Sequence, residues 1–300
     1  MRRRAGPAAY DAPVNARPLS PPLANPAAAL PGTAQREVLR CTGSGQAQAL
    51  DAIAEEVPVA LAYNGAPFVV MMATPADLED FALGFTLSEA IAARADEVHV
   101  DAVEHTLDGI AIALRIPEAD WQALATRRRN LQGRSGCGVC GAESIEAVLR
   151  APPVLAGEAR FTHAAVHRAV QALQARQPLN AATGAVHAAG FADAGGRLLL
   201  VREDVGRHNA LDKLIGALAR GGIDPGGGFA VATSRASYEM AMKAAQAGIP
   251  LLAAISAPTT LAIALAGSAR LCLVGFARTG GHVVYTHAQR LHGPLLENAP

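Results

Sequence analysis

Residues 196–222 read GRLLLVREDVGRHNALDKLIGALARGG, and this stretch decides the fold class. The apolar run LLLV at 198–201 is typical of a buried strand. The segment 207–222 then repeats apolar residues at helical spacing and ends in two glycines, which is a common way for a helix to end. A strand that leads at once into a helix is the repeating unit of an α/β fold.

The same alternation continues over the C-terminal half of the chain. Helices are predicted at 161–176, 235–248 and 257–269, and strands at 228–234, 249–256, 270–277 and 282–287. Alternating helices and buried strands favour three layers, with helices on both faces of a mixed, largely parallel sheet. Residues 151–300 are therefore expected to form a three-layer αβα domain.

The N-terminal half of the chain predicts a separate α+β lobe at 36–150. Two apolar runs flank Asn64-Gly65, a dipeptide typical of a two-residue hairpin turn. A helix is expected after the hairpin, with Thr74 placed to cap its first turn. The opening residues, 1–35, are rich in proline and alanine without apolar periodicity, so we expect a disordered tail there.

The composition disfavours several classes of function. The 26 basic residues balance the 26 acidic residues, whereas a nucleic-acid-binding protein normally carries a basic excess. No apolar run approaches the roughly 18 residues of a membrane span, and the start of the chain lacks the apolar core of a signal peptide. The 4 cysteines do not form the pattern of a secreted disulfide framework. A reducing cytoplasm is therefore the expected compartment.

Polar residues gather where the predicted strands end, and ligands of open α/β sheets bind beyond the carboxyl ends of strands. Four such ends carry them: EDVGRHNALDK (203–213), SRASYE (234–239), SAPTT (256–260) and FARTGG (276–281). Arginines beside free helix N-termini are typical of an anion site, and a phosphate-bearing ligand fits them. The structural alternative is that Ser234, Thr259 and Asp204 serve only as helix caps.

The segment GCGVCG contains Cys137 and Cys140, two residues apart between glycines. They could be half of a zinc site, with His163 and His167 as the other ligands, although the spacing differs from that of a zinc finger. They could form a redox disulfide, but the elements predicted ahead of them do not match the thioredoxin topology.

Two further possibilities differ in their chemistry. A zinc-dependent deaminase needs an H-x-E segment ahead of P-C-x-x-C, but His187 comes after the cysteines and neither the glutamate nor the proline is present. A thiol carrier needs a thiolate that reaches both a donor and an acceptor, and the surrounding glycines give the chain that freedom. Arg134 and the helix expected after the pair are placed to lower the pKa of a thiol. Physical reasoning leaves open which cysteine carries the group.

Several segments, in this order, resemble the FdhD/NarQ family of accessory proteins of formate dehydrogenase. They are EEVPVALAYNG, DLEDFALGFTLSE, GCGVCG, EDVGRHNALDK, SRASYEM and LVGFARTGGHVVYTH. The resemblance runs from Glu55 to Leu291 and leaves the tail outside. It implies a homodimer, and it implies that the C-terminal domain has the cytidine-deaminase fold without the zinc chemistry, in agreement with the missing H-x-E segment.

The resemblance also implies a sulfur carrier, that is, a carrier-type sulfurtransferase. Such a protein takes sulfur from a cysteine desulfurase as a persulfide. It passes that sulfur to the molybdenum bis-molybdopterin guanine dinucleotide cofactor before the cofactor is inserted into formate dehydrogenase. Cys137 matches the persulfide-bearing cysteine of the family, and Cys140 is the second member of the motif.

The expected cofactor contacts come from two sources, and a GDP-like nucleotide would mimic part of that cofactor. The resemblance assigns Phe276, Ala277, Arg278, Thr279, Gly280 and Gly281, and the strand ends add Arg207, His208, Ser234 and Arg235. Gly281 departs from the family pattern, because members often carry a second basic residue late in this segment. The alternative hypothesis is a zinc-stabilised nucleotide-binding accessory module without sulfur chemistry.

Overall fold

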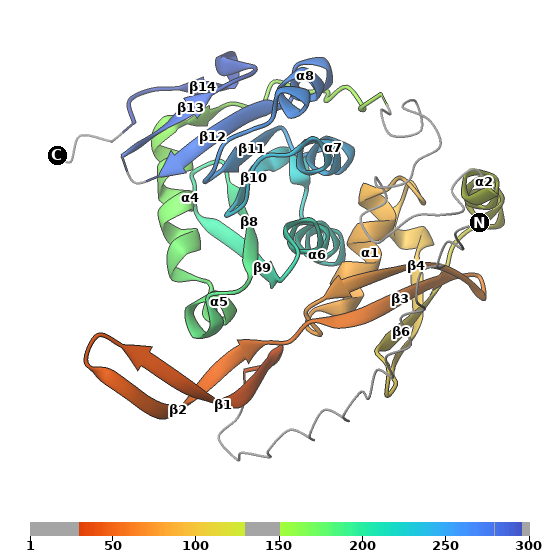
Figure 1. Cartoon of the computed structure of the whole chain (residues 1–300). Helices are drawn as coiled ribbons and strands as arrows, with labels where there is room; N and C mark the ends of the chain where they lie inside the picture. The colour runs from red at the N-terminus through yellow and green to blue at the C-terminus, as the bar shows by residue number, and fades with distance from the viewer. Residues whose placement is uncertain (1–29, 130–150, 279, 296–300) are drawn as a thin grey trace, which may run out of the picture.

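The computed structural model describes residues 30–129, 151–278 and 280–295 (Figure 1). A lobe from the N-terminal part of the described chain lies beside an α/β domain from the C-terminal part. Within these ranges no helix is both long enough and apolar enough to cross a bilayer.

A six-stranded sheet forms the centre of the α/β domain. Its strands are β8 (His187–Asp193), β9 (Leu198–Asp204), β10 (Gly228–Ala232), β11 (Leu251–Ala254), β12 (Cys272–Arg278) and β13 (Gly281–Val284). Their order across the sheet is β13-β12-β11-β10-β8-β9. β10, β11 and β12 pair in parallel, and the other neighbours pair antiparallel. The predicted mixed sheet is confirmed, with its parallel pairs confined to three adjacent strands.

Helices cover both faces of this sheet, as predicted (Figure 1). The helices on one face are α6 (Arg207–Arg220), α7 (Tyr238–Gln246) and α8 (Thr260–Ala269), and α4 (His163–Ala175) lies on the other. The short helix α5 (Pro178–Thr183) follows α4, and β7 (Phe161–Thr162) pairs with β14 (Leu291–His292). Each face is sealed by its own apolar core, so the three-layer αβα arrangement is confirmed.

A four-stranded sheet and two helices form the N-terminal lobe. The strands are β3 (Val57–Tyr63), β4 (Ala66–Ala73), β5 (His99–His105) and β6 (Ile110–Arg115), in the order β4-β3-β6-β5. Asn64 and Gly65 join β3 to β4 with positive φ angles of 48° and 82°, so the predicted hairpin is confirmed. α1 (Leu78–Ser88) packs on this sheet, and α2 (Glu118–Arg129) follows β6.

α1 begins later than its sequence pattern predicts, and the prediction that Thr74 caps it is wrong. The residue before the helix is Asp77, whose φ of 52° is left-handed. Thr74 is instead fully buried, and its backbone N–H donates to Asp204 Oδ2 (2.9 Å). Its carbonyl accepts from Lys213 Nζ (2.9 Å). A contact between the two halves of the chain therefore overrides the local capping signal.

The two halves meet where α1 crosses α6, at a separation that only glycine permits. A Cβ atom on Gly84 would lie 1.7 Å from the carbonyl oxygen of Asp212, and one on Gly216 would lie 1.9 Å from that of Asp80. The helix backbones therefore touch at both positions. Next to the crossing, the carboxylate of Asp212 forms a buried ion pair with Lys243 of α7 (2.9 Å).

A two-stranded ribbon projects from the body beside α5 (Figure 1). Its strands, β1 (Thr33–Thr42) and β2 (Gly45–Ala54), pair antiparallel over their whole length, and the ribbon exposes Leu39, Leu50 and Ile53. Residues 33–35, which were interpreted as the end of a tail, thus belong to a strand. Residues 30–32, also predicted as tail, lead into this strand through a turn in which the N–H of Thr33 donates to the carbonyl of Leu30 (3.0 Å). Residues 1–29 lie outside the described residues.

Candidate functional site

Four strand ends lie on one edge of the six-stranded sheet. β10, β11 and β12 run in the same direction. β8 is antiparallel to both β10 and β9, so β9 runs in that direction too. The N–H of Ala236 donates to the carbonyl of Ala257 (3.3 Å), and the N–H of Phe276 donates to that of Ser256 (3.2 Å). The polar segments found in the sequence therefore meet here. We call this region the carboxyl edge: residues 205–208, 233–239, 255–259, 276–278 and 280–281.

Arg207 begins α6 at the carboxyl edge, and the buried carboxylate of Asp204 organises the turn that precedes it. Asp204 Oδ1 accepts from the N–H of Gly206 (2.7 Å) and from the side-chain amide of Asn209 (2.9 Å), while Oδ2 pairs with Lys213 Nζ (2.6 Å). The Nε of Arg207 is buried and has no hydrogen-bond partner among the described residues. A buried N–H without a partner is costly, so it is suited to an anionic ligand.

His208 is the next residue of α6 and faces Glu239 on α7. Its Nε2 lies 2.7 Å from Glu239 Oε2, and both side chains are half-buried. Burial by itself would raise the pKa of Glu239, but the hydrogen bond with His208 and the electrostatic effect of His208, Arg207 and Lys243 outweigh burial and hold that pKa below its usual range. The carboxylate is therefore ionised at neutral pH and anchors the imidazole.

His187 joins this group, although the sequence analysis used it only to reject deaminase chemistry. It begins β8 directly opposite Asp204, and its Nδ1 lies 3.4 Å from Thr233 Oγ1. Burial lowers the pKa of His187, and the charges of Arg207 and His208 lower it further, so the imidazole is neutral at pH 7. Sequence reasoning missed this residue because β8 was not predicted: HAAGFAD holds few residues that favour strands.

The polar residues at the strand ends divide between capping and other roles. Ser237 and Thr259 cap α7 and α8, since each hydroxyl accepts from the backbone N–H three residues on. The capping interpretation is therefore confirmed for Thr259, but it is wrong for Ser234 and Asp204. The buried hydroxyl of Ser234 donates to the carbonyl of Arg235 (3.0 Å), and the Arg235 side chain is exposed.

The segment 276–281 begins in a bulge of β12. Phe276 has a φ of 51°, a strained conformation for a bulky residue, and it is 42% exposed. Ala277 points into the core that α4 covers. The Arg278 side chain is exposed, and its Nε lies 3.5 Å from the carbonyl oxygen of Ile255. The bulge therefore presents an aromatic ring and a guanidinium group at the carboxyl edge.

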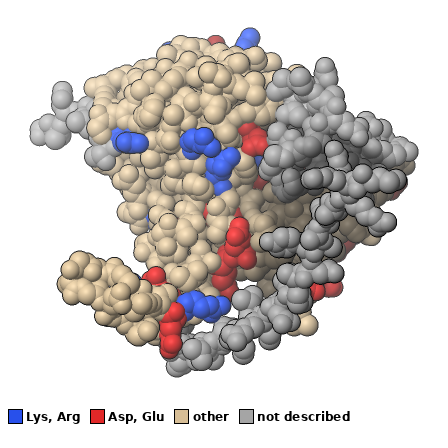
Figure 2. All heavy atoms as spheres, in the orientation of Figure 1, with Lys and Arg blue, Asp and Glu red and all other residues tan. Residues whose placement is uncertain are grey.

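The structure brings most of the expected contacts to one region. The face in Figure 2 carries a row of basic side chains across the α/β domain. Placed at the carboxyl edge are Arg207, His208, Ser234, Arg235, Phe276, Ala277, Arg278, Gly280 and Gly281. Thr279, Cys137 and Cys140 lie outside the described residues.

The zinc ligands considered in the sequence analysis have other neighbours. His163 Nδ1 forms a hydrogen bond of 2.8 Å with His282 Nε2, so this nitrogen is already engaged. In the part of the chain that the structure describes, no three His, Cys, Asp or Glu residues are arranged to hold a metal ion. Cys137 and Cys140, the other two ligands of that hypothesis, lie outside the described residues, so the zinc site stays an untested alternative.

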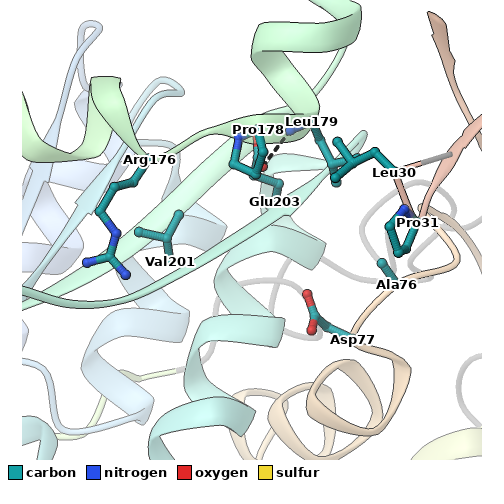
Figure 3. Close-up of a pocket in the computed structure, with 9 residues that line it drawn as sticks. All are labelled: Leu30, Pro31, Ala76, Asp77, Arg176, Pro178, Leu179, Val201 and Glu203. Carbon is teal, nitrogen blue, oxygen red and sulfur yellow. Dashed lines mark hydrogen bonds between the residues drawn. The ribbon is translucent and has the colours of Figure 1, made fainter. Parts of the chain in front are cut away.

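A cavity of about 480 Å³ lies beside β9, where α5 meets the base of the ribbon. Figure 3 shows Arg176, Glu203 and Asp77 around it. Glu203 accepts from the backbone N–H of Leu179 (2.9 Å), Arg176 donates to a backbone carbonyl (2.6 Å), and Asp77 lies 3.5 Å from Arg202. These charged groups are engaged by the fold, and no residue of the carboxyl edge lines the cavity. The carboxyl edge therefore stays the candidate ligand site predicted from the sequence.

A comparison with protein families agrees with these motifs. A model of the FdhD/NarQ family matches residues 54–292, which is most of the chain. This chain belongs to the FdhD/NarQ family. The FdhD/NarQ match includes all four strand ends of the carboxyl edge and the GCGVCG segment, and it leaves out β1 and nearly all of β2.

Relatives in the FdhD/NarQ family match over most of their length. A protein of Xanthomonas campestris named "Sulfur carrier protein FdhD" is 64% identical over 261 residues, which is 87% of this chain and 93% of that protein. A protein of Cupriavidus necator with the same name is 55% identical over 244 residues, covering 80% of this chain and 84% of that protein. The crystal structure of a putative formate dehydrogenase accessory protein from Desulfotalea psychrophila has a TM-score of 0.67 at 24% identity, covering 87% of this chain and 100% of that one. The two chains share a fold.

Proposed function

We propose that this protein is a sulfur carrier for formate dehydrogenase. Its membership of the FdhD/NarQ family and its 64% identity to a protein named as a sulfur carrier support this function. The observation that carries the proposal furthest is the carboxyl edge itself, where arginines and an exposed aromatic ring from separate strand ends face one region. Such a surface suits a large ligand that bears phosphates and aromatic bases.

In this proposal sulfur is accepted on Cys137. Its thiolate attacks the terminal sulfur of a persulfide on a cysteine desulfurase, the donor's S–S bond breaks, and the donor cysteine leaves as a thiolate. The two described cysteines suit this role less well. Burial raises the pKa of Cys272 to about 12, and the exposed Cys41 lies on the ribbon that the family match leaves out. This comparison supports the GCGVCG pair.

Cys140 completes the transfer. Its thiolate attacks the inner sulfur of the Cys137 persulfide, hydrosulfide leaves, and the two cysteines form a disulfide. Both electrons that turn the carried sulfur into hydrosulfide come from this dithiol, and a cellular thiol reductant reopens the disulfide. The protein therefore acts as a sulfurtransferase that consumes one dithiol in each cycle.

The acceptor is the molybdenum bis-molybdopterin guanine dinucleotide cofactor, bound as a substrate at the carboxyl edge. Its phosphates suit Arg207, Arg235 and Arg278, because guanidinium groups form charge-assisted hydrogen bonds with phosphate oxygens. The exposed ring of Phe276 is suited to stack on a guanine base. Formate dehydrogenase then receives the cofactor. The family resemblance supports a homodimer as the working form, and the cysteine pattern supports a cytoplasmic location.

A complementation experiment tests this function. A bacterium that makes formate dehydrogenase but lacks its own carrier should regain formate oxidation when it expresses this chain. The Cys137→Ala variant, at an equal protein level, should not restore the activity, whereas Cys41→Ala should restore it fully. No recovery with the wild-type chain would contradict the proposed function, and full recovery with Cys137→Ala would contradict the role of that cysteine.

A further inference from the structure

His282 lies on β13, opposite the bulge of β12 that contains Phe276. Gly275 pairs with Val283 and Arg278 pairs with Gly281, so two residues of β12 stand opposite one residue of β13. Those two are Phe276 and Ala277, and the single residue opposite them is His282. A bulge of this kind bends a strand and redirects its side chains, often next to a functional site. His282 is therefore the cross-strand neighbour of the bulge that presents Phe276.

The side chain of His282 is anchored to α4. Its Nε2 lies 2.8 Å from Nδ1 of His163, and the two rings stack with centroids 4.9 Å apart and an angle of 21°. His163 is the first residue of α4, and Thr162 fixes this helix end by accepting from the N–H of Ala165 (3.0 Å). The helix itself is packed in the core under the sheet. The bulge is thus tied, through one pair of imidazoles, to a rigid element.

A third histidine lies close to this pair. His167, one helical turn along α4, is 8% exposed, and its Nδ1 is buried without a hydrogen-bond partner among the described residues. Among the described residues, His163 and His167 are the titratable groups whose charges act on His282, and no described carboxylate contributes. If two of these three histidines were protonated at once, their positive charges would repel each other, and no described carboxylate would compensate.

We propose that His282 and His163 are positioning residues that hold the bulge of β12 and so aim Phe276 and Arg278 at the ligand. The inference rests on the proposed function, since it concerns the site at which the nucleotide part of the cofactor binds. His282 acts through the bulge and does not itself need to touch the ligand. Its role is open to measurement because replacing either imidazole removes the hydrogen bond that joins them.

The sign of the pH effect follows from the environment of His282. Burial lowers the pKa of His282, and the neighbouring histidines lower it further, which favours the form in which one imidazole N–H donates to a neutral partner. The anchor is therefore intact above pH 6.5, the ordinary value for a histidine, and it weakens as the pH falls below that value. Affinity for a nucleoside diphosphate should decrease in the same range.

Two kinds of variant separate the positioning role from other effects. Asparagine at 163 and glutamine at 282 place amide groups where Nδ1 and Nε2 now lie, so the double variant H163N/H282Q keeps a hydrogen bond that does not titrate. His282→Ala removes the anchor altogether. His105→Gln changes an exposed histidine on β5, in the other lobe, and serves as the matched control.

The experiment is calorimetry with GDP on the full-length chain between pH 5.5 and pH 8. At pH 7.5, His282→Ala should weaken GDP binding about tenfold, because the hydrogen bond that holds the bulge is lost. The double variant and His105→Gln should bind GDP like the wild type. Below pH 6.5 the wild type should lose affinity for GDP more steeply than H163N/H282Q. The phosphate of GDP titrates equally with both proteins, so the difference between their profiles reports on the histidines. Wild-type affinity in His282→Ala, or identical pH profiles for the wild type and the double variant, would overturn the inference.

A second readout does not depend on the ligand. Amide hydrogen exchange of ligand-free protein in the peptide 272–285 should be faster in His282→Ala than in the wild type, and it should be unchanged in His105→Gln. If the wild type binds no GDP at any pH, the nucleotide part of the proposed function fails, and the exchange rates alone decide whether His282 holds the bulge. Equal exchange in His282→Ala and the wild type would then refute the positioning role.

Discussion

Replacing Lys213 with methionine should strongly destabilise the protein. Lys213 and Asp204 are both fully buried, with Nζ 2.6 Å from Oδ2. Lys213 also donates to the carbonyl of Thr74, just ahead of α1 (2.9 Å). The ion pair therefore ties the first turns of α6, where the ligand site begins, to the N-terminal lobe.

The size of the effect follows from burial. Methionine keeps most of the lysine volume but leaves the carboxylate of Asp204 buried without a counter-charge, and removal of one partner from such a pair costs about 3–5 kcal/mol. The N–H groups of Thr74 and Gly206 and the amide of Asn209 still donate to this carboxylate. These charge-assisted bonds limit the penalty, so we expect a loss of about 3–4 kcal/mol in the free energy of unfolding.

Urea unfolding at pH 7, followed by circular dichroism, measures this loss. Arg115→Met is the matched control, because it breaks an ion pair with Asp101 of similar length (2.9 Å) whose side chains are 64% and 45% exposed. Water and salt screen that exposed pair, so its loss should change the free energy of unfolding far less than the loss of the buried pair. The double variant D204N/K213M should recover part of the lost stability, since no buried charge remains. A loss for Lys213→Met no larger than that of the control would refute the reasoning.

Three further predictions concern other parts of the structure. Gly84→Ala should lower the free energy of unfolding by about 3 kcal/mol or more, because the Cβ atom of the alanine would overlap a backbone carbonyl of α6. Gly267→Ala adds a Cβ atom in open space on α8, so it should not destabilise the protein in the same urea assay. Iodoacetamide at pH 7.5 should alkylate the exposed Cys41 of native protein and leave Cys272 unmodified until the chain is unfolded, as peptide mass mapping can show; rapid labelling of Cys272 would disprove its burial. Arg278→Ala should weaken GDP binding by about tenfold or more in calorimetry, and equal affinity would remove Arg278 from the site.

Much of the α/β domain could be predicted because its signals are local. Buried strands such as LLLV at 198–201 are continuous apolar runs, and Asn64-Gly65 fixes a hairpin with two residues. Thr74 shows where such reasoning fails. Its pattern is that of a helix cap, but contacts to Asp204 and Lys213, more than a hundred residues away, are stronger than the local preference.

The candidate site was predictable in outline for a similar reason. The rule that ligands bind beyond the carboxyl ends of strands needs only the order of strands and loops along the chain, and it selected Arg207 and Arg235 as candidates. The partners of these residues depend on the three-dimensional arrangement. His187 reaches the site through an antiparallel strand that the sequence hardly signals, and His163 meets His282 across 119 residues. Such pairings leave no periodic pattern in a single sequence.

Mass spectrometry of protein-bound persulfide is the most direct test of the proposal that Cys137 carries the sulfur. Wild-type protein, Cys137→Ala and Cys140→Ala are incubated with a cysteine desulfurase and cysteine, then trapped with an alkylating reagent and digested. We predict one additional sulfur atom on the peptide that contains Cys137 in the wild type and in Cys140→Ala, and none on any cysteine of Cys137→Ala. Undiminished loading of Cys137→Ala at Cys140 would contradict the account.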